Sequence, residues 1–240
     1  AFRGFFRNAN VDPVIRAREP LPFSIHYDSR LIRTRLNEWF LCIPSQASMP
    51  YALGDETQVP QNRVCSLDPG VRTFQTIFDA NGAVVEIGAK DLARLYRLCR
   101  QADLIQSKRS KIHGKKRYKL QRAYLRIFRR IRNLVDEVHK KLVNFLVLNY
   151  NVVLLPAFET SKMVTTNGVR KLQSKTVRSM LTWSHYRFKQ RLLEKSKTTA
   201  HCKVVICGEE YTSKTCTRCG SINNTLGGSK IFKCQQCALC

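Results

Sequence analysis

The sequence predicts an α/β protein in which one mixed sheet carries helices on its faces and a small cysteine-rich segment follows. Three observations support this class. Short apolar runs bounded by Pro and Gly predict strands, long stretches with apolar residues at steps of three and four predict helices, and two C-x-x-C pairs lie near the end of the chain. With 240 residues, the chain is long enough for one large domain with small additions.

The first part of the chain, residues 1–62, is predicted to be a partial N-terminal β module followed by a connector. Short β segments are expected at Phe23–Tyr27, Leu31–Leu36 and Trp39–Ile43. Residues 44–61 are rich in Pro, Ser and Gln, which is typical of a connector. Because the chain starts at Ala1 and stops directly after a cysteine pair, both ends are expected to be cuts in a longer protein.

Residues 63–87 predict a buried strand followed by a β-hairpin. Pro69-Gly70 should end the strand abruptly, and Asn81-Gly82 is a hairpin turn signal. The apolar residues of the first strand are Val64, Cys65 and Leu67, and the turn would join Thr73–Phe78 to Ala83–Ile87.

A basic helical insertion is predicted at residues 90–150. Its apolar stripe recurs at steps of three and four, and His113-Gly114 should break it into two helices. The stripe consists of Leu120, Tyr124, Ile127, Ile131, Leu134, Val138 and Leu142.

Two more short strands and one more helix follow. Val152–Leu155 is a short apolar strand stopped by Pro156, and Val204–Cys207 is another buried strand. Between them, Thr176–Lys197 is predicted to be one amphipathic helix. Its expected contact residues are Met180, Leu181, Trp183, Phe188 and Leu192.

This order of elements defines the predicted domains. A strand and hairpin followed by alternating helices and strands argue for a mixed sheet, in the element order of the RNase H-like fold. We therefore predict a nuclease-type domain at residues 63–210, which contains the helical insertion, and a zinc ribbon at residues 211–240.

The charge of the chain indicates a polyanionic partner. Lys and Arg number 42 against 17 Asp and Glu, a formal net charge of +25. Acids that could pair with these cations at helical spacing are nearly absent between Lys108 and Arg132. A solvated helix face is the alternative, but this surplus favours the phosphate backbone of nucleic acid. The expected binding residues are Lys115, Lys116, Arg117, Arg126, Arg129 and Arg130.

No secretory signal or membrane span is expected, because the chain has no run of about 18 apolar residues. The expected location is intracellular, in the nucleus or in the cytoplasm and nucleoid, depending on the host.

Two acids are candidate metal ligands. Asp68 ends the first strand, and Glu159 follows the strand that should lie beside it. Two nearby carboxylates repel each other unless a cation lies between them, and Mg²⁺ prefers such oxygen ligands. A pair of ions about 4 Å apart can assist phosphodiester cleavage. Alternatively, Asp68 only forms a turn and Glu159 only caps a helix.

The cysteines predict a structural zinc site. Cys216, Cys219, Cys234 and Cys237 follow the spacing C-x₂-C-x₁₄-C-x₂-C, which suits a tetrahedral thiolate site. Cys240 forms another C-x-x-C pair with Cys237, and redox-active cysteines are the alternative function. The scattered cysteines, expected to be small buried apolar residues, are Cys42, Cys65, Cys99, Cys202 and Cys207.

Three separated motifs resemble the TnpB and Fanzor family of transposon-encoded proteins. They are SLDPGVRTFQTIFDANGAVVEIG (66–88), LLPAFETSKMV (154–164) and YTSKTCTRCG with FKCQQC (211–237). The first motif is most similar to the branch found in eukaryotes and their viruses.

The resemblance implies an RNA-guided DNA endonuclease with a RuvC nuclease domain, whose partners are a guide RNA and a target DNA. It implies catalytic roles for Asp68 and Glu159 with Mg²⁺, and zinc binding by the four cysteines. The third catalytic residue of the family is an aspartate shortly after the last zinc cysteine, and it is absent from this sequence, which ends at Cys240. Activity of this chain is therefore not implied by the resemblance alone.

Two other functions remain open from the sequence. One is a non-catalytic protein that binds DNA or RNA through the zinc ribbon and the basic helices. The other is a structural protein of a ribonucleoprotein, in which the acids at the strand ends have no shared role.

Overall fold

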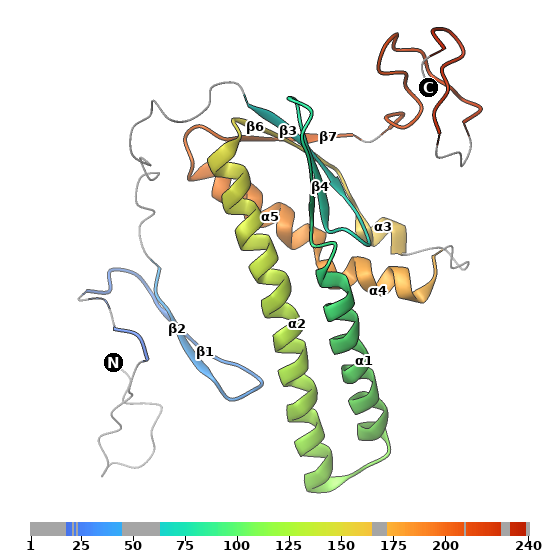
Figure 1. The fold of residues 1–240 in the computed structure, drawn as a ribbon. Coiled ribbons are helices and arrows are strands. Elements are labelled where there is room, and N and C mark those ends of the chain that lie inside the picture. Colours follow the sequence, from blue (N-terminus) through green and yellow to red (C-terminus); the bar gives the residue numbers. More distant parts are fainter. Residues whose placement is uncertain are drawn as a thin grey trace. The chain divides into compact units, whose positions relative to one another are not determined.

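A computed structural model describes residues 18–20, 22, 24–44, 63–164, 172–208, 210–226 and 231–238 (Figure 1). The chain divides into two compact units, Ala1–Ala47 and Ser48–Cys240. Each unit is described by itself.

The first unit contains a two-stranded antiparallel sheet. Strands β1 (Arg30–Arg33) and β2 (Trp39–Cys42) pair from Arg30 opposite Cys42 to Arg33 opposite Trp39. Asn37 turns the chain with a φ of 66°, and its N–H donates to the Thr34 carbonyl. Two of the expected β segments are thus confirmed, whereas the described residues 24–27 form no strand.

The second unit is built on a five-stranded mixed sheet in the order β5-β4-β3-β6-β7. Strand β3 lies at its centre, antiparallel to β4 on one side and parallel to β6 on the other, while β4–β5 is antiparallel and β6–β7 parallel. The predicted hairpin is confirmed, with Gly82 in its turn at a φ of 91°. The bounds are β3 Val64–Pro69, β4 Gln75–Asp79, β5 Val84–Ile87, β6 Val152–Pro156 and β7 Lys203–Cys207.

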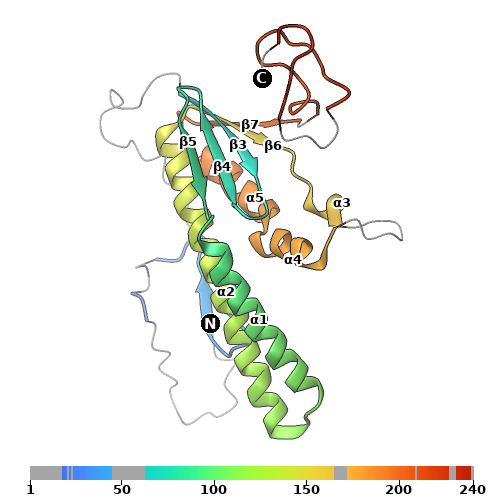
Figure 2. The same cartoon turned by 45° about the vertical axis from the view of Figure 1, so that its right-hand side comes forward.

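Within the described residues, five helices accompany the sheet (Figure 2). The two longest form an antiparallel hairpin, and α5 packs against α2 and β7. Among the described residues, no helix combines the length and the apolar composition needed to cross a membrane. The bounds are α1 Asp91–Ser110, α2 Gly114–Asn149, α3 Thr160–Val164, α4 Ser174–Trp183 and α5 His185–Lys197.

The central strand alternates between two environments, as a half-covered sheet requires. Cys65 and Leu67 are buried in the core that the helices share, and Pro69 is buried on the same face. Asp68 points to the opposite face and is exposed, as is Phe78 on the neighbouring strand. The sequence pattern of β3 therefore determines which face carries the acid.

The predicted break in the helical insertion is confirmed, because α1 ends at Ser110 and α2 begins at Gly114. The buried stripe of α2 differs from the predicted one. Val135 and His139 are its most buried members in the middle of the helix, while Leu134 and Val138 are only partly buried beside them. Ile131 and Leu142 of the predicted stripe are buried, and Ile127 packs against the core beside them. The predicted stripe omits His139 because imidazole is polar.

The single helix predicted at Thr176–Lys197 is wrong. Ser184 adopts a left-handed conformation, with φ 53° and ψ 51°, and separates α4 from α5. The Trp183 carbonyl accepts a hydrogen bond from His139 of α2, at 2.9 Å. Leu181, expected in the contact face, is 56% exposed, whereas the other four expected contact residues are buried.

A cluster of rings fills the centre of the core. The Phe74 ring lies 4.9 Å from the His139 ring, 5.1 Å from those of Trp183 and His185, and 5.2 Å from that of Phe188. The indole N–H of Trp183 donates to the Val71 carbonyl at 3.1 Å, so the buried polar group is satisfied. These contacts join the sheet, α2 and both C-terminal helices.

Gly88 lies against this ring cluster and is expected to tolerate no side chain. Its φ is 79°, and a Cβ atom would lie 3.0 Å from Phe74 Cβ and 3.1 Å from Trp183 Cη2. We expect Gly88→Ala to lower the free energy of unfolding by about 1–3 kcal/mol, measured by urea denaturation. Gly82→Ala is the matched control, because Gly82 also has a positive φ but no heavy atom would lie within 4 Å of its Cβ. Equal losses in both variants would contradict the steric part of this prediction.

Candidate functional site

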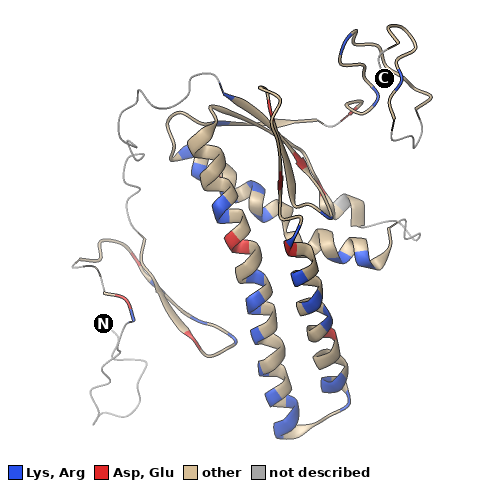
Figure 3. Cartoon of the chain, viewed as in Figure 1, with Lys and Arg blue, Asp and Glu red and all other residues tan. Residues whose placement is uncertain are grey.

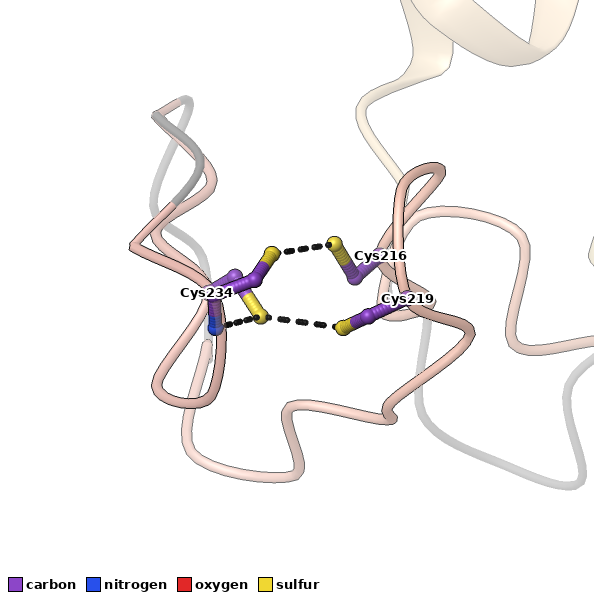
Figure 4. Close-up of side chains that lie close together, drawn as sticks. Cys216, Cys219 and Cys234 are labelled. Carbon is purple, nitrogen blue, oxygen red and sulfur yellow. Dashed lines mark hydrogen bonds between the residues drawn. The ribbon is translucent and has the colours of Figure 1, made fainter.

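The four predicted zinc cysteines come together. The Sγ atoms of Cys216, Cys219, Cys234 and Cys237 all lie within 4.8 Å of one another. The Cys216 and Cys237 sulfurs lie 3.5 Å apart. The Cys219 and Cys234 sulfurs are also 3.5 Å apart (Figure 4). A tetrahedral zinc ion with Zn–S bonds of about 2.3 Å requires sulfur separations of about 3.8 Å, so the cluster has the size of such a site.

Short-range hydrogen bonds shape the two cysteine turns. The Cys216 N–H donates to the Ser221 carbonyl at 2.8 Å, and the Gly220 N–H donates to the Cys216 carbonyl at 2.9 Å. Gly220 has a φ of 74°, a left-handed conformation that glycine adopts readily and that suits the tight turn after the first cysteine pair. The amide of Asn223 donates to the Lys233 carbonyl at 3.0 Å and links the first turn to the second.

The surroundings of the thiols favour the metal-binding form. The Ser221 hydroxyl lies 3.1 Å from the Cys219 sulfur and 3.2 Å from the Cys234 sulfur. Hydrogen bonding by Ser221 and by the Cys237 N–H lowers the pKa of Cys234 to about 5, and Ser221 also lowers the pKa of Cys219. Thiolates are the zinc ligands, so four such sulfurs fit a closed structural zinc site.

The remaining cysteines are partly as expected. Cys65, Cys99 and Cys202 are buried, which confirms their assignment as small apolar residues. Cys42 is exposed, so this assignment is wrong for Cys42, and Cys207 is intermediate. Cys42 lies in β2, which has only one neighbouring strand to cover it. The alternative ligand Cys240 lies outside the described residues.

Asp68 and Glu159 lie at the same edge of the sheet. β3 and β6 are adjacent and parallel, with Val64 opposite Val152, so their carboxyl ends meet. Asp68 is the last but one residue of β3, and Glu159 follows the end of β6 by three residues. Both residues are exposed. The Glu159 carbonyl accepts the Met163 N–H at 3.3 Å, so the backbone of Glu159 begins α3.

A cavity at this edge contains two buried polar side chains that sequence reasoning missed. Its volume is about 380 Å³, and Glu159, Gln75 and His185 are among the residues that line it. Gln75 is 1% exposed and His185 is 4% exposed. Gln75 lies within the first motif, at residues 66–88, but neither its amide nor His185 stands at a spacing that indicates a site, and only the fold brings β4 and α5 together here.

The predicted basic surface is exposed. All six expected nucleic-acid-binding residues are exposed, and no side chain in residues 103–130 is buried. Figure 3 shows Lys and Arg distributed along both helices of the α1–α2 hairpin. Within the hairpin, the Tyr124 ring lies 4.6 Å from that of Phe128 and 5.0 Å from the Arg109 guanidinium. Tyr118 is 62% exposed among the lysines and arginines, so the expectation that it is a core residue is wrong, and the hairpin offers mainly positive charge.

Two family models match the chain. The OrfB_IS605 model, described as a probable transposase, matches residues 48–155. The Cas12f1-like TNB domain matches residues 185–240, which include the cysteine cluster.

Curated relatives come from viruses and a bacterium. The putative transposase A625R of Paramecium bursaria Chlorella virus 1 is 34% identical over 172 residues, covering 71% of this chain and 38% of that protein. The TnpB-like protein L770 of Acanthamoeba polyphaga mimivirus is 27% identical over 247 residues, covering 99% of this chain and 45% of that protein. The CRISPR-associated endodeoxyribonuclease Cas12f1 of Sulfoacidibacillus thermotolerans is 26% identical over 109 residues, covering 45% and 24%. The chain therefore spans less than half the length of these relatives.

The fold is also similar to a solved structure. In a Cas12f1–sgRNA–target DNA complex, the similar chain has a TM-score of 0.52 and 17% identity, over 83% of this chain and 40% of that one. The viral relatives agree with the resemblance of the first motif to the branch of eukaryotes and their viruses. By these matches the chain is related to the TnpB-like, OrfB-type transposon proteins, and its residues 185–240 are similar to the Cas12f1-like TNB domain.

Proposed function

We propose that this chain is the nuclease part of a transposon-associated, RNA-guided DNA endonuclease, with Asp68 and Glu159 as its catalytic carboxylates. The observation that carries the proposal is the parallel pairing of β3 with β6. It directs two residues that are 91 positions apart to the same end of adjacent strands. Ligands of open α/β sheets bind outside the carboxyl ends of the strands, which is where both acids lie.

The sheet topology supports an RNase H-like, RuvC-type domain. An antiparallel three-stranded meander is followed by two parallel strands that are added on the side of the first strand, giving the order β5-β4-β3-β6-β7. The helical hairpin is inserted between the meander and β6. Asp68 on β3, the first strand of the meander, and Glu159 after β6, the next parallel strand, would be the two catalytic acids. They occur in the same order as the motifs in the sequence.

The donor set fits Mg²⁺. Asp68 and Glu159 offer exposed carboxylate oxygens, which hard divalent cations prefer to nitrogen or sulfur. When bound, such ions lower the pKa of water and stabilise the leaving oxygen of a phosphodiester. The two carboxylates would hold the cations at the strand edge and orient them toward a scissile phosphate.

The exposed hairpin supports nucleic acid as the partner. Lys115, Lys116, Arg117, Arg126, Arg129 and Arg130 would contact the phosphates of a guide RNA or of target DNA. Their charge positions a duplex without reading its sequence, so recognition of the target is assigned to base pairing with the guide. The zinc ribbon formed by the four cysteines would add a rigid, zinc-stabilised element.

The proposal predicts that Asp68→Asn abolishes Mg²⁺-dependent DNA cleavage. The substitution removes a charged metal ligand from an exposed position, so the rate should fall at least about a hundredfold while folding is retained. Cleavage by the protein, with the RNA that copurifies with it, is measured on DNA with and without Mg²⁺. Glu159→Gln should have the same effect.

Glu86→Gln on β5 is the matched control, because Glu86 is an exposed acid of the same sheet. β4 separates its strand from β3, the strand that carries Asp68. This control should cleave DNA at the wild-type rate. Wild-type cleavage by Asp68→Asn would show that the catalytic assignment is wrong.

A non-catalytic nucleic-acid-binding protein is the second candidate function. The thiol cluster and the basic hairpin support it, because neither depends on the two acids. Tight DNA or RNA binding by a wild-type protein that never cleaves DNA in Mg²⁺ would favour this function.

A further inference from the structure

The cavity beside Glu159 has the features of a ligand site. It lies where β3 and β6 end and the first turn of α5 begins, since Pro69, Pro156 and Tyr186 all line it. At about 380 Å³, it falls within the range of about 300–1,000 Å³ that is typical of small-ligand sites. Leu155 and Phe188 contribute buried apolar side chains to its wall.

Two polar groups in its wall have no partner. The Gln75 Oε1 atom and both ring nitrogens of His185 are buried, and none has a hydrogen bond within the described part of the chain. Desolvation lowers the pKa of His185 to about 4, and the nearby Gly70 backbone, which makes no hydrogen bond of good geometry to the ring, opposes this lowering. The ring is therefore neutral near pH 7. A neutral imidazole offers one donor and one acceptor, and Gln75 Oε1 offers another acceptor. Buried groups of this kind are costly unless a ligand satisfies them.

Aromatic and cationic side chains surround the polar pair. The Phe158 ring packs against His185 with its centroid 4.8 Å away. Tyr186 lines the cavity and is 69% exposed, which leaves its ring accessible for stacking. Lys189, one helical turn after His185, also lines the cavity and adds a positive charge.

We propose that this cavity binds one unpaired base of single-stranded DNA, next to the strand edge that carries Asp68 and Glu159. The inference rests on the proposed function, because a cleaved strand must pass this edge. Enzymes that act on nucleic acid hold unstacked bases by aromatic stacking and by hydrogen bonds to the base edge. Here Tyr186 stacks on the base, His185 and Gln75 bond to its edge, and Lys189 contacts the adjoining phosphate.

The chemistry of the wall favours a base over other ligands. The buried polar side chains of the cavity wall, Gln75 and His185, are neutral. They therefore suit the mixed donors and acceptors of a nucleobase better than an isolated ion. In the part of the chain that the structure describes, the four cysteines are the only cluster of three or more metal-ligating side chains, and none of them lines this cavity. A phosphodiester alone would contact Lys189 and leave Gln75 Oε1 unsatisfied. The phosphodiester oxygens and the Gln75 amide oxygen are all acceptors, so no hydrogen bond can form between them.

The test compares two single strands of about ten nucleotides, one of oligo-dT and one with the same phosphates but abasic sugars. Binding is measured by fluorescence anisotropy without Mg²⁺. The wild-type protein should bind oligo-dT about tenfold more tightly than the abasic strand. Tyr186→Ala and His185→Phe should each reduce this preference about three- to tenfold and leave binding of the abasic strand unchanged.

Lys195→Ala is the matched control, because Lys195 is an exposed cation of α5 that does not line the cavity. It should weaken binding of both strands equally. Tyr186 is exposed, so its variant should remain folded even if His185→Phe does not. Equal affinity of the wild-type protein for both strands, or an unchanged preference in Tyr186→Ala, would overturn the proposal. Because no Mg²⁺ is present, this result is independent of whether Asp68 and Glu159 cleave DNA.

Discussion

Replacing Cys234 with Ser is expected to abolish zinc binding and to unfold the cysteine segment. Cys234 is a strongly activated thiol, with a pKa lowered to about 5 by Ser221 and by backbone N–H groups. A serine hydroxyl is not deprotonated at neutral pH and cannot replace the thiolate. Since the described residues 210–226 and 231–238 include no helix or extended strand, the two cysteine turns depend on the ion and on a few hydrogen bonds.

Zinc content of the purified protein, measured by mass spectrometry, should fall from about one ion per chain to nearly none. Limited proteolysis should then cut the variant within this segment. Cys42→Ser is the matched control, since Cys42 is an exposed cysteine in the other compact unit, and it should keep its zinc. A full equivalent of zinc in Cys234→Ser would mean that Cys240 or another residue completes the site.

Acidification is expected to destabilise the core at pH values well above those at which carboxylates protonate. Burial lowers the pKa of both His139 and His185 from 6.5 to about 4. His139 is completely buried, its Nε2–H donates to the Trp183 carbonyl, and the Arg191 guanidinium donates to its Nδ1 at 3.3 Å. The positive charges of Arg191 and Arg187 reinforce the lowering, and Asp136 opposes it.

The direction of the effect follows from proton binding. Between about pH 6.5 and 4 the unfolded chain binds protons on these imidazoles and the folded chain does not, so unfolding becomes more favourable as the pH falls. The stabilisation is complete above about pH 6.5. For each histidine, the free energy of unfolding is expected to fall by on the order of 3 kcal/mol between pH 6.5 and pH 4, because one pKa unit corresponds to about 1.4 kcal/mol.

The measurement is urea denaturation at several pH values, followed by tryptophan fluorescence. His139→Gln keeps a neutral donor and should have a flatter dependence of unfolding free energy on pH than the wild type. Both proteins carry the same four-cysteine cluster, so the difference between their pH dependences isolates the contribution of His139. His113→Gln is the control, because His113 is exposed between α1 and α2. Identical slopes for the wild type and His139→Gln would contradict the assignment.

Much of the fold could be predicted because local rules determine it. Pro69 ends β3, Asn81-Gly82 forms the hairpin turn, and the interruption at His113-Gly114 separates α1 from α2. The cysteine spacing likewise predicted which four thiols would gather, since each C-x-x-C pair forms a turn by itself.

The failures share a different cause. Ser184 is not a residue that normally ends a helix, yet it separates α4 from α5 at the point where the Trp183 carbonyl bonds to His139. His139 was left out of the predicted stripe because imidazole is polar, although it stacks on Phe74 at the centre of the core. In both cases contacts between distant segments overrode local propensity.

The amino-acid sequence by itself determined the strands, the turns, the basic hairpin and the identity of the thiol cluster, because these depend on neighbours within a few residues. The order of elements predicted that β3 lies beside β6, but only the tertiary structure fixed the register of this pairing, which places Asp68 and Glu159 at one edge. The tertiary structure also decided that Gln75 and His185 line one cavity. The physical reason is that the register of parallel strands and the burial of polar groups arise from packing between segments far apart in the chain, which no local pattern records.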